Sequence, residues 1–394
     1  MLKLDSHLSG RHFLHVPGPS QVPARILRAI SFPAIDHRGP EFGQLGLKVL
    51  SGIKQIFKTT QPVIIYSASG TGAWEGALVN TLSPGDLVLM YETGQFSNLW
   101  KKLAERLGFK TEYLGQSGIK DWRCGVDAAK IEARLKDDTG HQIKAVCVVH
   151  NETSTGVISD MAAVRKAIDA AKHPALLIVD SVSGLASAEY RHDEWGVDVS
   201  ICGSQKGMML PPGLGFNAIS AKAIEASKTA TSPKAFLAWD DILEANKTGY
   251  WPTTPSVNLL YGLHESIEML MAEGLDNVFA RHQRLALACR AAVSAWGLET
   301  QCMDSAAHSP VVTAVVTPEG VDADALRKLI HERYNLSLGT GLGKVKGRVF
   351  RIAHMGDCNA LSLLAAISGC EMGMKAFGIK LKGSGVLAAQ ELLQ

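Results

Sequence analysis

Short, fully apolar runs alternate with segments of helical periodicity through the first two-thirds of the chain. The runs cover residues 63–66, 87–91, 143–150, 175–180 and 198–203, and residues 72–82, 96–107 and 160–171 have helical spacing. Strands that are apolar on both faces and joined by helices are typical of a parallel sheet buried on both sides. The sequence therefore predicts an α/β fold with a mainly parallel sheet covered by helices.

The pattern changes after Pro255. Residues 257–271 and 278–296 read as helices separated by Gly274, and strand-like and helical segments follow at 310–316, 323–334, 348–352 and 359–374. This predicts a smaller C-terminal α+β domain. Because single cores stop growing at roughly 250–300 residues, we expect the 394 residues to divide into an N-terminal arm, 1–19, a large domain, 20–277, and a small domain, 278–394.

Charge and cysteine content exclude several classes of partner. The net charge is only +2, without a long basic run, so no nucleic-acid partner is expected. No stretch of about 18 apolar residues is present, and residues 1–20 lack the pattern of a signal peptide, so neither a membrane span nor secretion is expected. The seven cysteines form no C-x-x-C pair, which favours a reducing, cytoplasmic location without a metal site.

Two charged side chains stand at the ends of successive apolar strands. Lys206 lies in Gly-Ser-Gln-Lys-Gly, directly after the run 198–203, where small neighbours would let its amine enter a crevice. Asp180 ends the run 175–180, and a carboxylate there is costly unless it meets a cation. Taken singly, a lysine on a turn is usually solvated, and such an acid is equally a helix cap or a metal ligand. Their combination points to a shared site.

Two further strand ends are followed by small and hydroxyl residues. Residues 67–75 link a strand to a helix, and Ser69 and Thr71 would help the helix N-terminus to bind an anion. A dinucleotide fingerprint is the rival interpretation, but Glu75 occupies its third glycine position. Residues 149–156 supply hydroxyls and a tight turn, which in isolation would be an ordinary turn motif.

These four motifs, in this order, resemble those of class V (fold-type I) pyridoxal-phosphate aminotransferases. The resemblance covers nearly the whole chain, including residues 15–19, 36–40, 80–86, 193–198, 250–252, 334–339 and 350–352. Within the class, the chain is most similar to members that use glyoxylate as amino acceptor. The resemblance implies a fold-type I transferase whose large domain binds pyridoxal 5'-phosphate (PLP).

The resemblance also implies roles for matching positions in binding the cofactor. Lys206 would hold PLP as a Schiff base and move the substrate proton, and Asp180 would pair with the pyridine nitrogen. The other cofactor contacts would be Phe96 on the ring face, Thr153 at the ring hydroxyl, and Ser69, Gly70, Thr71 and Gln205 at the phosphate.

Substrate and subunit contacts are implied in the same way. Arg351 would bind the substrate carboxylate, and the arm near Gly18 would help to close the pocket. Tyr250 and Thr253 would reach the phosphate in the neighbouring subunit, which implies a homodimer with shared active sites. Pairing of dimers into tetramers stays open. Apart from Arg38, the matched motifs contain no second arginine for a distal carboxylate such as that of 2-oxoglutarate, so Arg38 is the candidate for that role.

The implied reaction is ping-pong transfer of the amino group of L-serine to glyoxylate, which yields hydroxypyruvate and glycine. Alanine or aspartate as donor stays open, because small side-chain differences are worth only ~1–3 kcal/mol in a pocket. A class V lyase would need a mobile cysteine near the ring, and a non-catalytic PLP-binding protein would not need Arg351. Departures from common family residues at Ser181, Gly184, Thr253 and Ala353 bear on the choice of donor.

Overall fold

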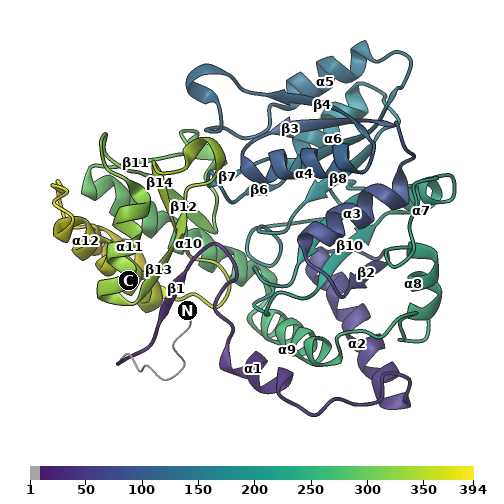
Figure 1. Ribbon diagram of the computed structural model, residues 1–394, viewed down its shortest axis with the longest axis horizontal. Helices are drawn as coiled ribbons and strands as arrows, with labels where there is room; N and C mark the ends of the chain where they lie inside the picture. The colour runs from purple at the N-terminus through teal and green to yellow at the C-terminus, as the bar shows by residue number, and fades with distance from the viewer. Residues whose placement is uncertain (1–8) are drawn as a thin grey trace.

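The computed structural model describes residues 9–394 and contains two main sheets, each packed with its own helices (Figure 1). The larger sheet has seven strands in the order β2-β10-β9-β8-β5-β3-β4. Their bounds are β2 (Val63–Tyr66), β3 (Leu87–Glu92), β4 (Lys110–Gly115), β5 (Ile143–Val149), β8 (Leu176–Asp180), β9 (Val199–Gly203) and β10 (Gly215–Ile219). The predicted, mainly parallel sheet is confirmed.

One strand of this sheet, β10, runs antiparallel to both of its neighbours, β9 and β2. It follows β9 through the loop 204–214 without a crossover helix, and such a short connection favours an antiparallel partner. The sequence prediction missed β10 and also missed the edge strand β4, whose residues are half-buried or exposed and include a lysine and a glutamate.

The two faces of the larger sheet bury separate hydrophobic cores, because successive residues of a strand point to opposite faces. In β5, Val146 and Val148 join the core beneath one layer of helices, whereas Cys147 and Val149 join the other core. The first layer is α1 (Ala24–Ile30), α2 (Pro40–Phe57), α5 (Ala128–Asp137), α6 (Met161–Ala170) and α9 (Val257–Glu273); the second is α3 (Gly70–Thr81), α4 (Gln95–Arg106), α7 (Ala221–Ser227) and α8 (Trp239–Asn246).

The smaller sheet has the order β1-β13-β14-β12-β11. Its strands are β1 (Phe13–His15), β11 (Glu299–Thr300), β12 (Val312–Val316), β13 (Leu336–Thr340) and β14 (Val349–Ala353), and its helices are α10 (Leu275–Trp296), α11 (Ala323–Tyr334), α12 (Ala360–Ala376) and α13 (Gly385–Leu393). The predicted α+β arrangement is confirmed. The expected boundary after residue 277 falls inside α10, and residues 1–8 of the expected arm lie outside the described residues.

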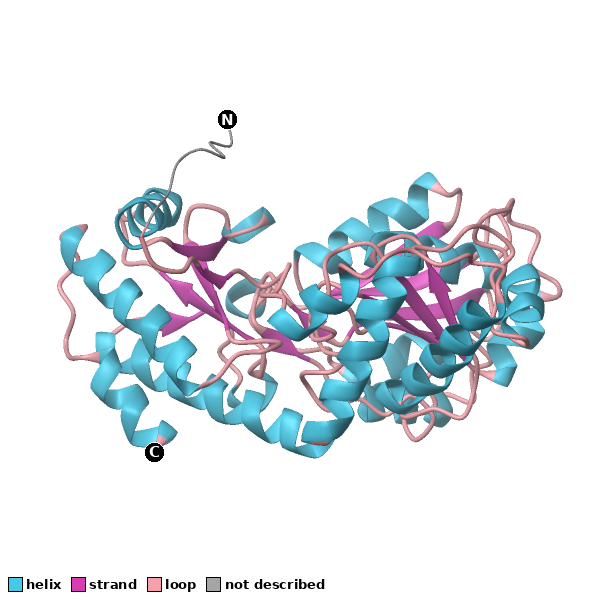
Figure 2. Ribbon diagram, turned by 90° about the horizontal axis from the view of Figure 1, so that it is seen from below, coloured by secondary structure: helices cyan, strands magenta, loops and turns pink. Residues whose placement is uncertain are grey.

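Two further features place the site between the sheets. The arm contributes β1, which pairs in parallel with β13 of the smaller sheet, and the hairpin β6 (Asn151–Glu152) and β7 (Val157–Ile158) extends from β5. Figure 2 shows the smaller sheet beside the larger one, with helices around both.

Short 3-10 turns occur at η1 (Gly118–Lys120), η2 (Ser305–Ala307) and η3 (Gly343–Val345). Within residues 9–394, no helix has the length and apolarity needed to cross a bilayer.

Candidate active site

A cavity of about 250 Å³ lies where β8 and β9 end and α3 begins. Ligands of open α/β sheets bind beyond the carboxyl ends of the strands, and this cavity occupies that position. Its walls bring together nine residues that the sequence predicted for the site: Gly18, Ser69, Gly70, Thr71, Phe96, Thr153, Asp180, Gln205 and Lys206.

The side chain of Lys206 is buried in this cavity, with only 7% of the residue exposed. Its Nζ donates a hydrogen bond to the carbonyl oxygen of Pro17, and Gly18 packs so closely on the side chain that a Cβ there would collide with it. Burial, assisted by the positive charge of Arg351, lowers the pKa of Lys206 to about 8. The amine is therefore far easier to deprotonate than a surface lysine.

Asp180 is the last residue of β8, and it is 4% exposed. Trp74 donates from its Nε1 to Oδ2 at 3.1 Å, and the backbone N–H of Val182 donates to Oδ1 at 2.8 Å. Burial raises the pKa of Asp180 to about 7, and these two donors oppose the rise. A cation in the cavity would favour the ionised form of the carboxylate.

The first turn of α3 presents backbone N–H groups that have no partner within the helix, and Ser69, its N-cap residue, adds no side-chain hydrogen bond. Gly70 must be small here, since a Cβ would come within 2.7 Å of Val182. Gln205 adds a buried Oε1 that has no hydrogen-bond partner among the described residues. The turn, with the hydroxyls of Ser69 and Thr71, is suited to a phosphate group.

The opposite wall comes from the β6–β7 hairpin and the start of α4. Thr153 donates from Oγ1 to the hydroxyl of Ser183 at 3.1 Å, and Asn151 also donates to that hydroxyl, at 2.8 Å. The Phe96 ring lies 5.9 Å from the Nζ of Lys206, measured to the ring centroid. A flat ring linked to Lys206 would therefore have an aromatic neighbour on this side.

Arg351 is a buried cation beside the cavity, and it is 6% exposed. Its Nε donates to the carbonyl of Thr340 at 2.8 Å, and Nη1 donates to the carbonyl of Thr153 at 2.9 Å. Nη2 makes no hydrogen bond to any described residue. Burial lowers its pKa to about 10, so the group stays protonated near neutrality. The guanidinium is thus held in place with donors left for an anion.

Tyr250 and Thr253 do not line the Lys206 cavity of their own chain. They lie with His37 and Arg38 around a separate cavity of about 280 Å³, and the Tyr250 hydroxyl donates to the carbonyl of Gly39 at 3.2 Å. Arg38, the candidate for a distal carboxylate, is therefore grouped with the two residues expected to serve a neighbouring subunit.

Sequence reasoning missed four residues in the cavity wall: Trp74, Asn151, Val182 and Ser183. Each lies within or beside a motif that was singled out. Trp74 contacts Asp180, and Asn151 contacts Ser183, across a long stretch of sequence, so local pattern carried no signal for these three. Val182 contacts Asp180 through its backbone N–H, which residue type does not reveal. One departure has a structural reason: a Cβ at Gly184 would collide with the ring of His150. No cysteine of the described residues lines the cavity, which leaves a cysteine-dependent lyase without its reactive group.

Solved structures share the fold over nearly the whole chain. The structure of ureidoglycine–glyoxylate aminotransferase from Bacillus subtilis superposes with a TM-score of 0.89 at 25% identity, covering 98% of this chain and 99% of that one. The fold is that of the fold-type I PLP transferases. The family model "Aminotransferase class-V" matches residues 12–354, and the chain belongs to this family of PLP-dependent aminotransferases.

Two relatives are more similar in sequence. Serine–glyoxylate aminotransferase of Arabidopsis thaliana is 47% identical over 388 residues, which is 98% of this chain and 96% of the relative. L-aspartate–glyoxylate aminotransferase of Paracoccus denitrificans (strain Pd 1222) is 45% identical over 386 residues, with the same coverage.

The cavity fits PLP, the cofactor of this family. It offers the buried amine of Lys206, the buried carboxylate of Asp180, and an uncapped helix N-terminus beside Gln205, whose Oε1 has no partner among the described residues.

Proposed function

We propose that this aminotransferase moves the amino group of L-serine to glyoxylate, yielding hydroxypyruvate and glycine. The observation that carries the proposal is the small cavity, about 250 Å³, in which Asp180 is buried and Lys206 is covered by Pro17 and Gly18. A cavity of this size that also holds the cofactor leaves space for small amino and oxo acids only. The name of the Arabidopsis relative supplies the donor and the acceptor.

When bound, PLP supplies an aldehyde that links to amines and a ring that accepts the electrons of the substrate's Cα bond. Lys206 would hold the cofactor through its amine, and its lowered pKa of about 8 would let Nζ hold and move the Cα proton. Asp180 would hold a negative charge beside the ring nitrogen. Arg351 orients the substrate by its carboxylate.

The remaining cofactor contacts orient the ring and its phosphate. Phe96 would pack on the ring face and Thr153 would bond the ring hydroxyl. Ser69, Gly70 and Thr71 at the start of α3, with Gln205 after β9, would hold the phosphate. Gly18, pressed on Lys206, excludes water from the reacting atoms.

The choice of donor is tested by comparing kcat/KM for serine, alanine and aspartate at fixed glyoxylate. The aspartate-using relative from Paracoccus makes aspartate the second candidate. A higher kcat/KM for aspartate than for serine would overturn the assignment of the donor but not the reaction type.

The acceptor is tested by comparing glyoxylate, pyruvate and 2-oxoglutarate at fixed serine. Among the described residues no arginine lines the cavity, and Arg351 adjoins it through the carbonyl of Thr153. With Arg351 assigned to the substrate's own carboxylate, the distal carboxylate of 2-oxoglutarate would stay unpaired in a closed site, which costs several kcal/mol. If 2-oxoglutarate is the best acceptor, Arg38 is the next residue to substitute.

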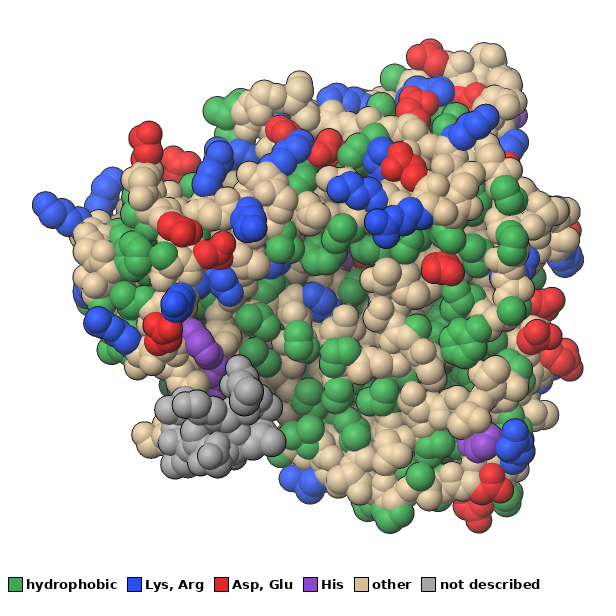
Figure 3. Space-filling model, in the orientation of Figure 1, with side chains coloured by type: hydrophobic (Ala, Val, Ile, Leu, Met, Phe, Trp, Pro, Cys, Tyr) green, Lys and Arg blue, Asp and Glu red, His purple; other side chains and the backbone are tan. Residues whose placement is uncertain are grey.

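The assembly we propose is a homodimer in which Tyr250 and Thr253 of one subunit reach the phosphate of the other. Two observations support it. Tyr250 and Thr253 lie apart from the cavity of their own chain. Apolar side chains in and between α1 and α2 are exposed, namely Leu27, Phe32 and Leu47. Figure 3 shows hydrophobic side chains gathered on the lower part of the face that it draws. Sedimentation would separate a dimer from a tetramer.

The division into arm, large and small domains at residues 1–19, 20–277 and 278–394 also stands as a proposal. It is supported by the separate cores of the two sheets. A cytoplasmic location is proposed as well, on the seven cysteines that are all unpaired. Partners are then small amino and oxo acids and a second copy of the chain.

A further inference from the structure

Glu152 is a fully buried carboxylate at the end of β6, with 0% exposure. The comparisons and the sequence motifs assign it no role, although it immediately precedes Thr153. A carboxylate in such a position is costly unless its charge is matched by donors, so its contacts define what it does.

The contacts of Glu152 come from two segments. From the first turn of α4, the backbone N–H groups of Phe96 and Ser97 donate to Oε2, both at 3.1 Å. From its own turn, Ser154 donates to Oε1 with its N–H at 3.1 Å and with its hydroxyl at 2.6 Å. First-turn N–H groups have no intrahelical partner, so Glu152 acts as the N-terminal cap of α4 from 56 residues further along the chain.

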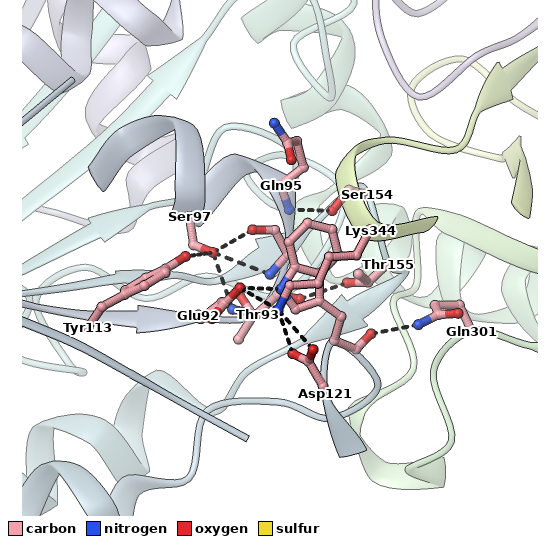
Figure 4. Close-up of polar contacts among 12 residues, drawn as sticks. Glu92, Thr93, Gln95, Ser97, Tyr113, Asp121, Ser154, Thr155, Gln301 and Lys344 are labelled. Carbon is pink, nitrogen blue, oxygen red and sulfur yellow. Dashed lines mark hydrogen bonds and ion pairs between the residues drawn. The ribbon is translucent and has the colours of Figure 1, made fainter. Parts of the chain in front are cut away.

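The start of α4 and the turn after β6 are closely packed. A Cβ on Gly94 would come within 2.5 Å of Cγ of Glu152 and would also collide with the Ser154 hydroxyl. That hydroxyl accepts from the N–H of Gln95 at 2.9 Å. Figure 4 shows Ser154 directed at Gln95, beside Ser97 at the start of α4. The start of α4 and the turn after β6 therefore hold one fixed relative position.

Burial raises the pKa of Glu152, and the donors from Ser154, Ser97 and Phe96 oppose that rise and favour the ionised form. Its charge then lies among the charged groups of the site. It raises the pKa values of Lys206, Arg351 and Asp180 through Coulomb interaction. Arg351 in turn donates to the carbonyl of Thr153, the next residue. The carboxylate thus interacts with two buried cations and adjoins Phe96 and Thr153, two of the residues that are proposed to touch the cofactor ring.

We propose that Glu152 is a positioning residue: it fixes the Phe96 ring and the Thr153 hydroxyl around the cofactor and supplies a negative charge that offsets Lys206 and Arg351. The inference rests on the proposed roles of Phe96 and Thr153. It does not depend on which amino acid or oxo acid the enzyme prefers.

The test compares Glu152→Gln with Glu92→Gln in the PLP-loaded protein. Glu92 is a matched control, because it ends β3 three residues before α4 but accepts from Trp122 and Lys344 and not from the start of α4. Three quantities are measured: the dissociation constant of PLP, the visible circular dichroism of the bound cofactor, and the pH midpoint of its absorbance.

Glu152→Gln is expected to weaken PLP binding about tenfold or more and to reduce the visible dichroism. The midpoint should move to lower pH, because removal of a negative charge destabilises a proton at Lys206, while Arg351, Asp180 and Cys202 still face that group. A purely structural cap would lower stability without moving the midpoint. Glu92→Gln should match the wild type in all three quantities.

Ser154→Ala tests mainly the geometry, since it removes the hydroxyl that joins Glu152 to Gln95 but leaves the carboxylate and its three N–H donors. We expect reduced dichroism with a smaller shift of the midpoint than in Glu152→Gln. A Glu152→Gln protein with wild-type binding and midpoint would overturn the proposal. If that variant does not fold, an unchanged dichroism in Ser154→Ala would overturn it. Absence of serine-to-glyoxylate transfer in the wild type would refute the proposed function alone.

Discussion

Replacement of Asp180 by asparagine isolates one charge in the site. The side chain is buried, and its two oxygens accept from Trp74 and Val182. An amide can keep the bond from Val182, but its NH₂ group then faces either the indole N–H of Trp74 or the protonated ring nitrogen. Both are donors, so the variant loses the charge and leaves one donor unpaired.

The size of the effect follows from burial. Removal of one partner of a buried, hydrogen-bonded ion pair costs about 3–5 kcal/mol. At 1.36 kcal/mol for each factor of ten in rate, kcat should fall by roughly a hundredfold to several thousandfold. Much of this loss should appear in kcat and not in KM, because the ring needs its protonated nitrogen most in the transition state.

The assay is steady-state transfer from serine to glyoxylate by protein whose PLP content has been measured by absorbance. Asp160→Asn is the control, because Asp160 caps α6 on the surface and asparagine caps helices equally well. A folded, PLP-loaded Asp180→Asn protein with nearly normal kcat would refute the role given to this carboxylate.

Three further predictions concern the lysine, the subunits and the indole. Borohydride reduction followed by peptide mapping should place the pyridoxyl group on Lys206, and a label elsewhere would contradict this. The apo-protein should bind PLP about tenfold faster per pH unit up to about pH 8, because the lowered pKa leaves the amine deprotonated there. A binding rate that is independent of pH would contradict this. Mixing Lys206→Ala chains with Tyr250→Phe/Thr253→Ala chains should restore part of the activity, and hybrids without any activity would argue for self-contained sites. Trp74→Phe should lower kcat about tenfold by removing a bond to Asp180, and an unchanged kcat would count against that contact.

Much of the larger sheet could be predicted, because its strands are apolar on both faces and its helices have regular spacing. The strand ends then located Lys206 and Asp180, since parallel strands end at one edge. The direction of β10 could not be predicted, because it depends on how the loop 204–214 returns, and that loop has no periodicity.

Most contacts of the site that escaped prediction join residues that are far apart in sequence. Trp74 of α3 donates a hydrogen bond to Asp180 at the end of β8. Glu152 caps α4, a helix that begins 57 residues earlier in the sequence. Arg351 was identified by resemblance. Its hydrogen bonds to the carbonyls of Thr153 and Thr340 could not be predicted, because they depend on how the small sheet packs against the β6–β7 hairpin.

The pairing of β1 with β13 has a consequence for how the protein is made. Phe13–His15 bond to residues 336–338, and the next residues of the arm, Pro17 and Gly18, cover Lys206. Synthesis proceeds from the N-terminus, so residues 13–15 leave the ribosome long before the strand that they need exists. The cover over the lysine is therefore completed among the last steps of biogenesis, and a nascent chain that stops short of residue 336 carries its reactive amine without that anchor.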